Sequence, residues 1–195
     1  MPKLPVSRFA SALLLAMVLL AVCTPGRGQV ASPTDQKLNL NVAVVVDPDF
    51  CTTKLKKNHE TFEVGRAACD VFKSALEQGF STVTSVATEK DAVVAQAILV
   101  PRFVDVSATK TMGAFSTREL TVLLEWTVKD KSGRTVWIET IQGSGKNHMG
   151  NSFTYKKDLK EIIEYAVQDL AQKSVVAMDS SPELRKLEQK IVLAR

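Results

Sequence analysis

The sequence predicts an α+β domain in which a mixed sheet of four to five strands carries two helices packed on one face. Three observations lead to this class: a hairpin pattern from Thr117 to Gln142, a long amphipathic stretch from Tyr155 to Met178, and a strand, helix and strand between Leu38 and Val86. The predicted order is β-α-β-β-β-β-α, followed by a short C-terminal helix.

The hairpin is the clearest local pattern. Between Arg118 and Asp130 every second residue is apolar, which is the period of a strand with one buried face; the apolar set is Leu120, Val122, Leu124, Trp126 and Val128. Asp130 to Gly133 offers turn chemistry, and Thr135 to Ile141 is the return strand. A lone hairpin is marginal in water, so its apolar face needs a cover.

The best cover is the helix predicted from Tyr155 to Met178. Its apolar residues recur at helical spacing and form one stripe of Leu159, Ile162, Ile163, Ala166, Val167 and Leu170. Six such contacts, at roughly 1.5–3 kcal/mol each, would make this helix the largest contributor to the core. Pro182 after Ser181 starts a short terminal helix that ends near Leu193.

The first half of the domain reads less regularly. Strands are predicted at 38–46, 80–86 and 94–106, with a helix from Phe62 to Gln78 that Gly79 closes. Pro101 cannot donate to a ladder, so it predicts a sheet edge or a bulge. Residues 50–60 are predicted as a solvated loop, with binding of a lipid or polysaccharide phosphate at the basic run 54–58 as the alternative. The glycine-rich run 143–150 lacks the spacing of a phosphate-binding loop and is predicted as a flexible connector.

The N-terminus has the order of an export signal. Lys3 and Arg8 precede an apolar run of 14 residues, Phe9 to Val22, and Pro25 to Gly28 breaks it. Fourteen helical residues span about 21 Å, short of the ~30 Å hydrocarbon core, so a permanent membrane span is disfavoured. We predict an export signal at 1–28, a linker at 29–37, one domain at 38–178 and a helical tail at 179–195.

Two fates of this signal stay open. Leu20-Ala-Val-Cys23 resembles the lipobox of bacterial lipoproteins, in which the cysteine is acylated, although Val22 stands where a small residue is usual. The alternative is cleavage after Gly28, with Gly26 and Gly28 as the small residues. The expected location is therefore the periplasm, with or without a tether to the outer membrane at Cys23.

Net charge gives no reason to expect a nucleic-acid partner. Three of the 25 basic residues (Lys3, Arg8 and Arg27) lie in the leader, which has no acidic residue, so the rest has 22 basic against 21 acidic residues. An excess of one charge supplies no general attraction for nucleic acid.

Cysteine counting favours a disulfide. Once Cys23 is removed or acylated, Cys51 and Cys69 remain as a pair in an oxidising compartment. Their bond would close a loop of about 18 residues and stabilise the fold by on the order of 3 kcal/mol. Two buried free thiols are the alternative. Neither the cysteines nor the distant His59 and His148 have the spacing of metal ligands, so no metal site is expected.

No catalytic constellation is recognisable, and no cofactor is implied. His59 and His148 lie in predicted loops without a nucleophile motif, and Asp47 and Asp49 are ordinary turn residues. The loops at 107–116 and 143–153 should leave the same end of the sheet. Their apolar residues suggest a contact surface for a protein partner or an acyl chain, unless they fold down over the sheet: Met112, Phe115, Met149 and Phe153.

The order of these features resembles small bacterial envelope lipoproteins. The leader with its near-lipobox, the helix ending in Gly79-Phe80, the Lys90-Asp-Ala92 turn, the hairpin with Lys131-Ser-Gly133 and the long terminal helix are similar to ABC-type transport auxiliary lipoproteins, YajG and the lipopolysaccharide-assembly protein LptE. The resemblance implies an exported, non-enzymatic accessory protein that contacts a transporter or assembly machine. A periplasmic regulator of a peptidoglycan synthase and a small hydrolase are the alternatives, the latter disfavoured.

Overall fold

The computed structural model describes residues 37–111, 117–148 and 155–193 of the chain. Within these ranges the elements follow the order β1 (Leu38–Val45), α1 (Pro48–Cys51), β2 (Leu55–Lys57), β3 (Glu60–Phe62), α2 (Val64–Gly79), β4 (Phe80–Val86), a 3-10 turn η1 (Glu89–Asp91), β5 (Ala97–Lys110), β6 (Thr117–Asp130), β7 (Thr135–His148), α3 (Tyr155–Ser180) and α4 (Pro182–Leu193).

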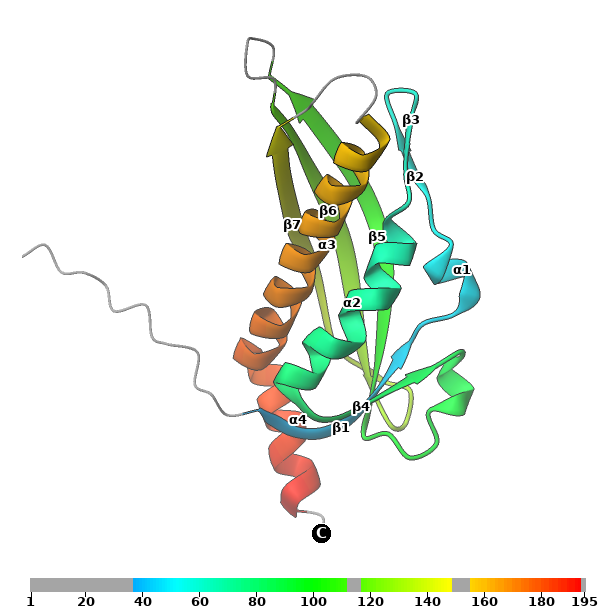
Figure 1. The fold of residues 1–195 in the computed structure, drawn as a ribbon. Coiled ribbons are helices and arrows are strands. Elements are labelled where there is room, and N and C mark those ends of the chain that lie inside the picture. Colours follow the sequence, from blue (N-terminus) through cyan, green and yellow to red (C-terminus); the bar gives the residue numbers. More distant parts are fainter. Residues whose placement is uncertain (1–36, 112–116, 149–154, 194–195) are drawn as a thin grey trace, which may run out of the picture. The chain divides into compact units, whose positions relative to one another are not determined.

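Five of these strands form one mixed sheet in the order β4-β1-β5-β6-β7, and β2 and β3 form a separate hairpin. β1 runs parallel to both β4 and β5, whereas β6 is antiparallel to β5 and to β7. The helices α2 and α3 lie side by side over one face of this sheet (Figure 1). The predicted α+β class is therefore confirmed, including the mixed sheet, the two covering helices and the C-terminal helix.

The core lies between this face and the two helices. The alternating residues Leu120, Val122, Leu124, Trp126 and Val128 of β6 are all fully buried. Trp126 packs against Phe72 of α2, with ring centroids 5.3 Å apart, and its indole Nε1 donates to Ser174 Oγ of α3 at 2.8 Å. The hairpin and the long helix thus pack together as their periodicities predicted.

Residues 143–148 are not the flexible connector that their glycines suggested, because β7 continues through them to His148. Gly143 and Gly145 lie where α3 crosses the strand. A Cβ on Gly143 would lie 2.3 Å from the carbonyl oxygen of Ala166, and one on Gly145 would lie 2.3 Å from that of Ile162. Here glycine removes side chains so that a helix can approach a strand closely.

The segment between β1 and α2 is also more structured than predicted. Asp47 caps the short helix α1 by accepting a hydrogen bond from the N–H of Phe50, and β2 and β3 form a tight hairpin with positive φ at Asn58 and His59. Phe62 belongs to β3, so α2 begins at Val64 and not at Phe62. Three-residue strands are too short to give a periodic signal in sequence.

The structure joins Cys51 of α1 to Cys69 of α2 by a disulfide, the pairing that the cysteine count favoured, with the two Cα atoms 5.6 Å apart. Phe50 of α1 stacks on Phe103 of β5, with centroids 5.0 Å apart. The Lys57 ammonium lies 3.1 Å from the Asp105 carboxylate of β5. We call residues 48–62 the flap, since they lie beside the part of β5 that β1 leaves uncovered.

Pro101 lies in the part of β5 that β1 does not cover. β1 pairs with β5 only from Ala97 to Leu99, so beyond Leu99 the side of β5 opposite β6 is an edge of the sheet. Pro101 therefore removes no hydrogen bond to β1. The register of β5 against β6 also shifts between Phe103 and Asp105. The local edge that the proline predicted therefore occurs, whereas the register shift lies beyond Pro101, which itself pairs in register with Trp126.

The chain continues from α3 into α4, whose Leu184 and Leu187 join the main core. Ser181 Oγ accepts a hydrogen bond from the N–H of Leu184 at 3.3 Å, and Pro182 is the first helical residue, as predicted. In the part of the chain that the structure describes, no helix combines the length and the apolar character needed to cross a membrane.

Candidate partner-binding edge

The four residues predicted to form a contact surface, Met112, Phe115, Met149 and Phe153, lie outside the described residues, as does Cys23. The strand ends that flank them are described. Lys110 pairs with Arg118 and Thr117 pairs with His148, so β5, β6 and β7 all reach the same end of the sheet. The surface itself stays a prediction.

A cluster of polar side chains lies at this end of the sheet, on the face that the helices cover. Arg118, only 5% exposed, occupies the buried face of β6 in phase with Leu120. Its guanidinium forms an ion pair with Glu60 of β3 and donates to the Tyr155 hydroxyl at 3.1 Å. That hydroxyl in turn donates to Glu60 at 2.6 Å. The cluster ties the flap, the sheet and the first turn of α3 together.

The electrostatics of this cluster are those of a structural ion pair. Partial burial opposes ionisation of Glu60, but hydrogen bonds from Arg118 and Tyr155 outweigh it and hold the pKa of the carboxyl below its ordinary value. Burial likewise works against the charged Arg118, yet its bond to Glu60 raises the pKa of the guanidinium. A carboxyl group whose pKa lies below its ordinary value is a weak proton acceptor and has no proton to donate near neutral pH, so it is poorly suited to general acid–base catalysis.

The other polar residues singled out in the sequence have local structural surroundings. His59 lies in the β2–β3 turn and His148 ends β7, both exposed. Lys54 of the basic run pairs with Glu63 at 2.6 Å, and Lys57 pairs with Asp105. Among the described residues, no three His, Cys, Asp or Glu side chains are grouped so that they could hold a metal ion.

The outer edge of β7 is the candidate binding site, because its backbone groups could pair with another strand. β7 is the last strand of the sheet and is 14 residues long, whereas the opposite edge strand, β4, has seven. The N–H of Ser144 points away from β6, since it donates to Asp169 of α3 at 2.8 Å. Backbone groups alternate between the two sides of a strand, so Ile138, Thr140 and Gln142 also direct their N–H and C=O groups outward.

Within the described ranges, these three outward positions differ from Ser144 in having no partner. Neither their N–H nor their C=O groups make a hydrogen bond to any other described residue outside the sheet pairing. Ile138, Thr140 and Gln142 are also exposed, Ile138 by 58%. Unpaired backbone groups on an exposed edge are a template for another strand.

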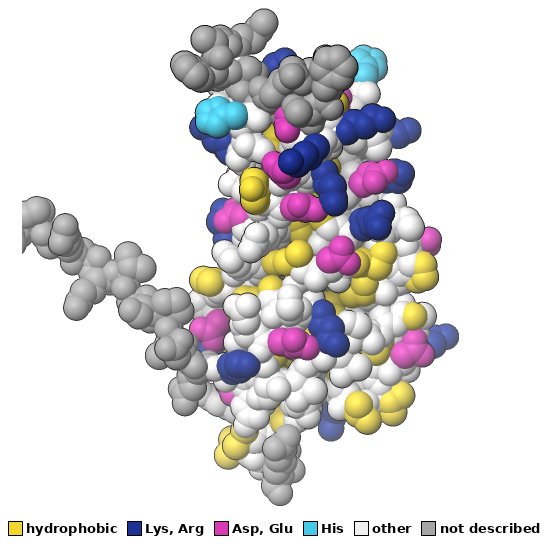
Figure 2. All heavy atoms as spheres, viewed as in Figure 1, with side chains coloured by type: hydrophobic (Ala, Val, Ile, Leu, Met, Phe, Trp, Pro, Cys, Tyr) yellow, Lys and Arg dark blue, Asp and Glu magenta, His cyan; other side chains and the backbone are white. Residues whose placement is uncertain are grey.

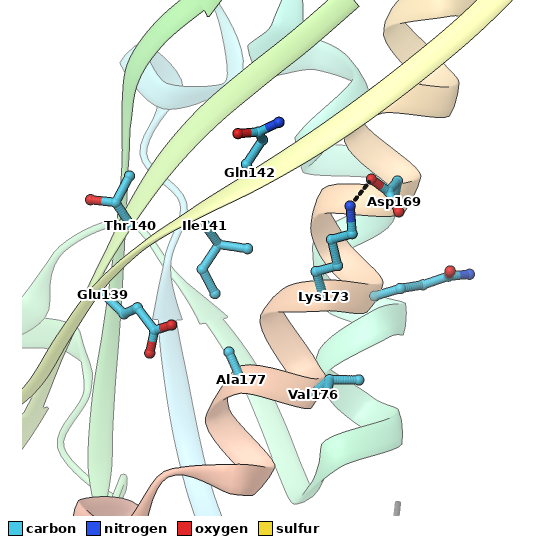
Figure 3. Close-up of a pocket in the computed structure, with 9 residues that line it drawn as sticks. Glu139, Thr140, Ile141, Gln142, Asp169, Lys173, Val176 and Ala177 are labelled. Atoms are coloured by element: carbon cyan, nitrogen blue, oxygen red, sulfur yellow. Dashed lines mark hydrogen bonds and ion pairs between the residues drawn. The ribbon is translucent and has the colours of Figure 1, made fainter. Parts of the chain in front are cut away.

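A groove of about 530 Å³ runs between this part of β7 and the C-terminal half of α3 (Figure 3). Ile141 points from the strand toward the helix, whereas Thr140 points away from it. The volume lies in the range of binding sites. The groove is lined by Glu139, Thr140, Ile141, Gln142, Asp169, Gln172, Lys173, Val176 and Ala177.

Charge in the groove is only partly neutralised. Lys173 donates to Asp169 at 2.7 Å. Burial opposes ionisation of Asp169, but this bond and the one from Ser144 outweigh it and keep the pKa of the carboxyl below its ordinary value. Glu139 makes no ion pair or hydrogen bond with another described side chain, so the groove carries one uncompensated negative charge.

A second hollow of about 630 Å³ lies between α2 and α3, with Ala67, Leu159 and Ile163 among its lining residues. Its rim mixes acidic and basic side chains: Glu63, Arg66, Asp70, Lys156, Lys160 and Glu164. Figure 2 shows the two signs of charge interspersed over the visible face of the described residues. Most of its lining residues belong to the helices α2 and α3, whose backbone groups pair within each helix, so the β7 groove is the stronger candidate.

The sequence did not identify this edge. The apolar positions Trp137 and Ile141 continue in phase into Gly143 and Gly145, and a small residue at every second position is the signal that could have extended the strand. The position of β7 at the border of the sheet depends on strand order, which periodicity does not contain.

No family model and no curated protein matches the sequence. Solved structures do match. A Xanthomonas campestris protein of the DUF330 family superposes with a TM-score of 0.53 and 10% identity, over 82% of this chain and 93% of that one. A candidate lipoprotein from Caulobacter crescentus gives 0.47 and 12%, over 75% and 89%, and a minor lipoprotein from Acinetobacter baumannii gives 0.44 and 11%, over 80% and 95%. The Xanthomonas likeness shows a shared fold.

Proposed function

We propose that this chain is an exported, non-enzymatic accessory protein of the bacterial envelope, which acts by binding an extended segment of a protein partner along β7. The observation that carries the proposal is the free outer edge at Ile138, Thr140 and Gln142, next to a groove. Strand addition to such an edge is a common mode of peptide recognition, because backbone hydrogen bonds supply affinity and the groove supplies selectivity.

The predicted export signal supports the location in the periplasm, and the resemblance to transport auxiliary and assembly lipoproteins supports a transporter or assembly machine as the partner. An outer-membrane tether would come from acylation of Cys23. Mass spectrometry of the mature protein tests this directly: a lipid-modified N-terminal cysteine is expected for a tethered protein, and a first residue of Gln29 would exclude the tether.

Site-specific photocrosslinking in living cells tests the binding edge. A photoreactive residue at Thr140 should give an adduct with an envelope protein, and the same residue at Glu119, exposed on the interior strand β6, is the matched control. Adducts at Thr140 alone support the proposal. Adducts containing transport or assembly components support the proposed partner class, whereas a peptidoglycan synthase would support the alternative. Equal yields at both positions, or none at Thr140, would overturn the edge as the site.

A further inference from the structure

The geometry of β7 determines which side chains of an added strand could contact the groove. A neighbouring strand lies about 4.8 Å away and turns successive side chains to opposite faces. Residues opposite Ile138, Thr140 and Gln142 would exchange backbone hydrogen bonds with them, and their side chains would face away from α3. Residues opposite Glu139 and Ile141 would face α3 and enter the groove. Recognition therefore falls on two positions separated by one residue.

The position opposite Ile141 suits an apolar side chain. Ile141 forms the strand wall of the groove, and Val176 and Ala177 contribute apolar surface from α3. Val176 is 55% exposed, so its apolar surface is open to water in the free protein. An apolar side chain placed here would cover this surface, which is the favourable direction of the hydrophobic effect.

The position opposite Glu139 suits a basic side chain. The other charged residues of the groove, Asp169 and Lys173, already neutralise each other at 2.7 Å. Glu139 has no ionic partner among the described residues, and its side chain belongs to the helix side of β7. A lysine or arginine opposite it would pair with the one uncompensated charge, while an acidic residue there would be repelled.

The direction of the added strand follows from the sheet. β5, β6 and β7 pair antiparallel, and antiparallel pairing is slightly more stable per residue than parallel pairing. An antiparallel segment passes Ile141 before it reaches Glu139. We infer that β7 accepts an extended protein segment in which an apolar residue is followed two positions later by lysine or arginine, an inference that rests on the proposed function.

Fluorescence anisotropy with two synthetic peptides tests this chemistry. Both are fluorescein-labelled, threonine-rich nonapeptides; one has Val-Thr-Lys at its centre and the other has Val-Thr-Glu. At low salt we expect the lysine peptide to bind about fivefold more tightly, with a difference that shrinks as salt is added. Glu139→Lys should reverse the order. Equal affinities for the two peptides, both sensitive to the backbone changes below, would overturn the charge inference and leave the edge as the binding site.

Two changes to the backbone test strand addition itself. Thr140→Pro removes an outward N–H that bonds to no strand of the sheet, and Thr140→Val, the matched control, changes only the side chain. We expect the proline variant to lose binding at least tenfold and the valine variant to retain it, with unchanged far-UV circular dichroism in both. If the proline variant does not fold, N-methylation of the central threonine of the peptide removes the reciprocal donor instead. Binding that survives both changes, or no binding of either peptide, would overturn the inference and strand addition together.

Discussion

The carboxylate of Asp169 on α3 accepts a hydrogen bond of 2.8 Å from the backbone N–H of Ser144 on β7. This contact divides the outer edge of the sheet into two parts. From Gly143 toward the C-terminal end of β7, the helix lies directly against the strand, and Asp169 binds the outward N–H of Ser144. On the N-terminal side of Gly143 the helix and strand border a groove, and the outward groups of Gln142, Thr140 and Ile138 have no partner among the described residues. The same helix, α3, thus covers one part of the β7 edge and leaves the other part accessible.

Loss of the hydrogen bond between the Ser144 N–H and Asp169 should destabilise the protein. Asp169→Ala removes a charge-assisted bond to a backbone N–H and the ion pair with Lys173, so we expect a loss of roughly 1–3 kcal/mol in the free energy of unfolding. Urea denaturation followed by tryptophan fluorescence measures it. Glu164→Ala is the control, since Glu164 pairs with Lys160 on the exposed side of the same helix at 3.4 Å and should cost well under 1 kcal/mol. Equal losses of unfolding free energy in both variants would contradict a stabilising role for the contact between Asp169 and Ser144.

The close approach of α3 should make Gly143 intolerant of any side chain. Its added Cβ would lie 2.4 Å from the Leu170 Cβ as well as 2.3 Å from a backbone oxygen, so Gly143→Ala must push the helix off the strand. We expect a loss of about 1–3 kcal/mol or more in unfolding free energy. Gly133→Asn is the comparison: Gly133 has φ +81° and nothing within 4 Å, and asparagine tolerates that conformation. Thermal melts in which Gly143→Ala is no less stable than Gly133→Asn would disprove the tight contact.

The disulfide should stabilise the domain by holding the flap to α2. Closing a loop of 18 residues is worth on the order of 3 kcal/mol in the chain-entropy model. We therefore expect the double variant Cys51→Ser, Cys69→Ser to unfold at lower urea concentration than the oxidised protein. Reductant should lower the midpoint of the wild-type protein and leave that of the double variant unchanged. A wild-type midpoint that does not respond to reductant, in a sample shown to be reduced, would contradict this stabilisation.

The ion pair between Glu60 and Arg118 should make stability depend on pH in the acidic range. Because the pKa of Glu60 is lower in the folded protein than its ordinary value of 4.5, the unfolded chain binds protons more readily. The contribution is thus fully present above about pH 4.5 and is lost as pH falls through the folded pKa.

Comparison with Glu60→Gln isolates this contribution. We expect the variant to be roughly 1–3 kcal/mol less stable at pH 7, with the difference from wild type narrowing below pH 4.5 as Glu60 becomes protonated. Urea midpoints measured between pH 3 and pH 7 provide the test. A constant difference across that range would show that the charge of Glu60 does not contribute.

Much of the helix and strand content was accessible from the sequence, because it depends on neighbours within a few positions. The two-residue period of β6 identified its buried face, whereas the burial of Arg118 on that face was found only in the structure. The helical spacing of Ile162, Ala166 and Leu170 likewise identified the side of α3 that meets the sheet. The pair Cys51 and Cys69 was favoured by counting alone.

Tertiary structure decided what each of these surfaces meets. The partner of Arg118 is Glu60, 58 residues earlier in the chain, and no local pattern links them. Gly143 and Gly145 suggested a mobile loop until α3 was placed against them. Among the described residues, the outer edge of β7 is unpaired because β7 is the last strand of the sheet. Local periodicity reports which side of an element is buried, whereas strand order and helix placement are set by packing between distant segments, and at β7 that packing is what leaves backbone groups open to a partner.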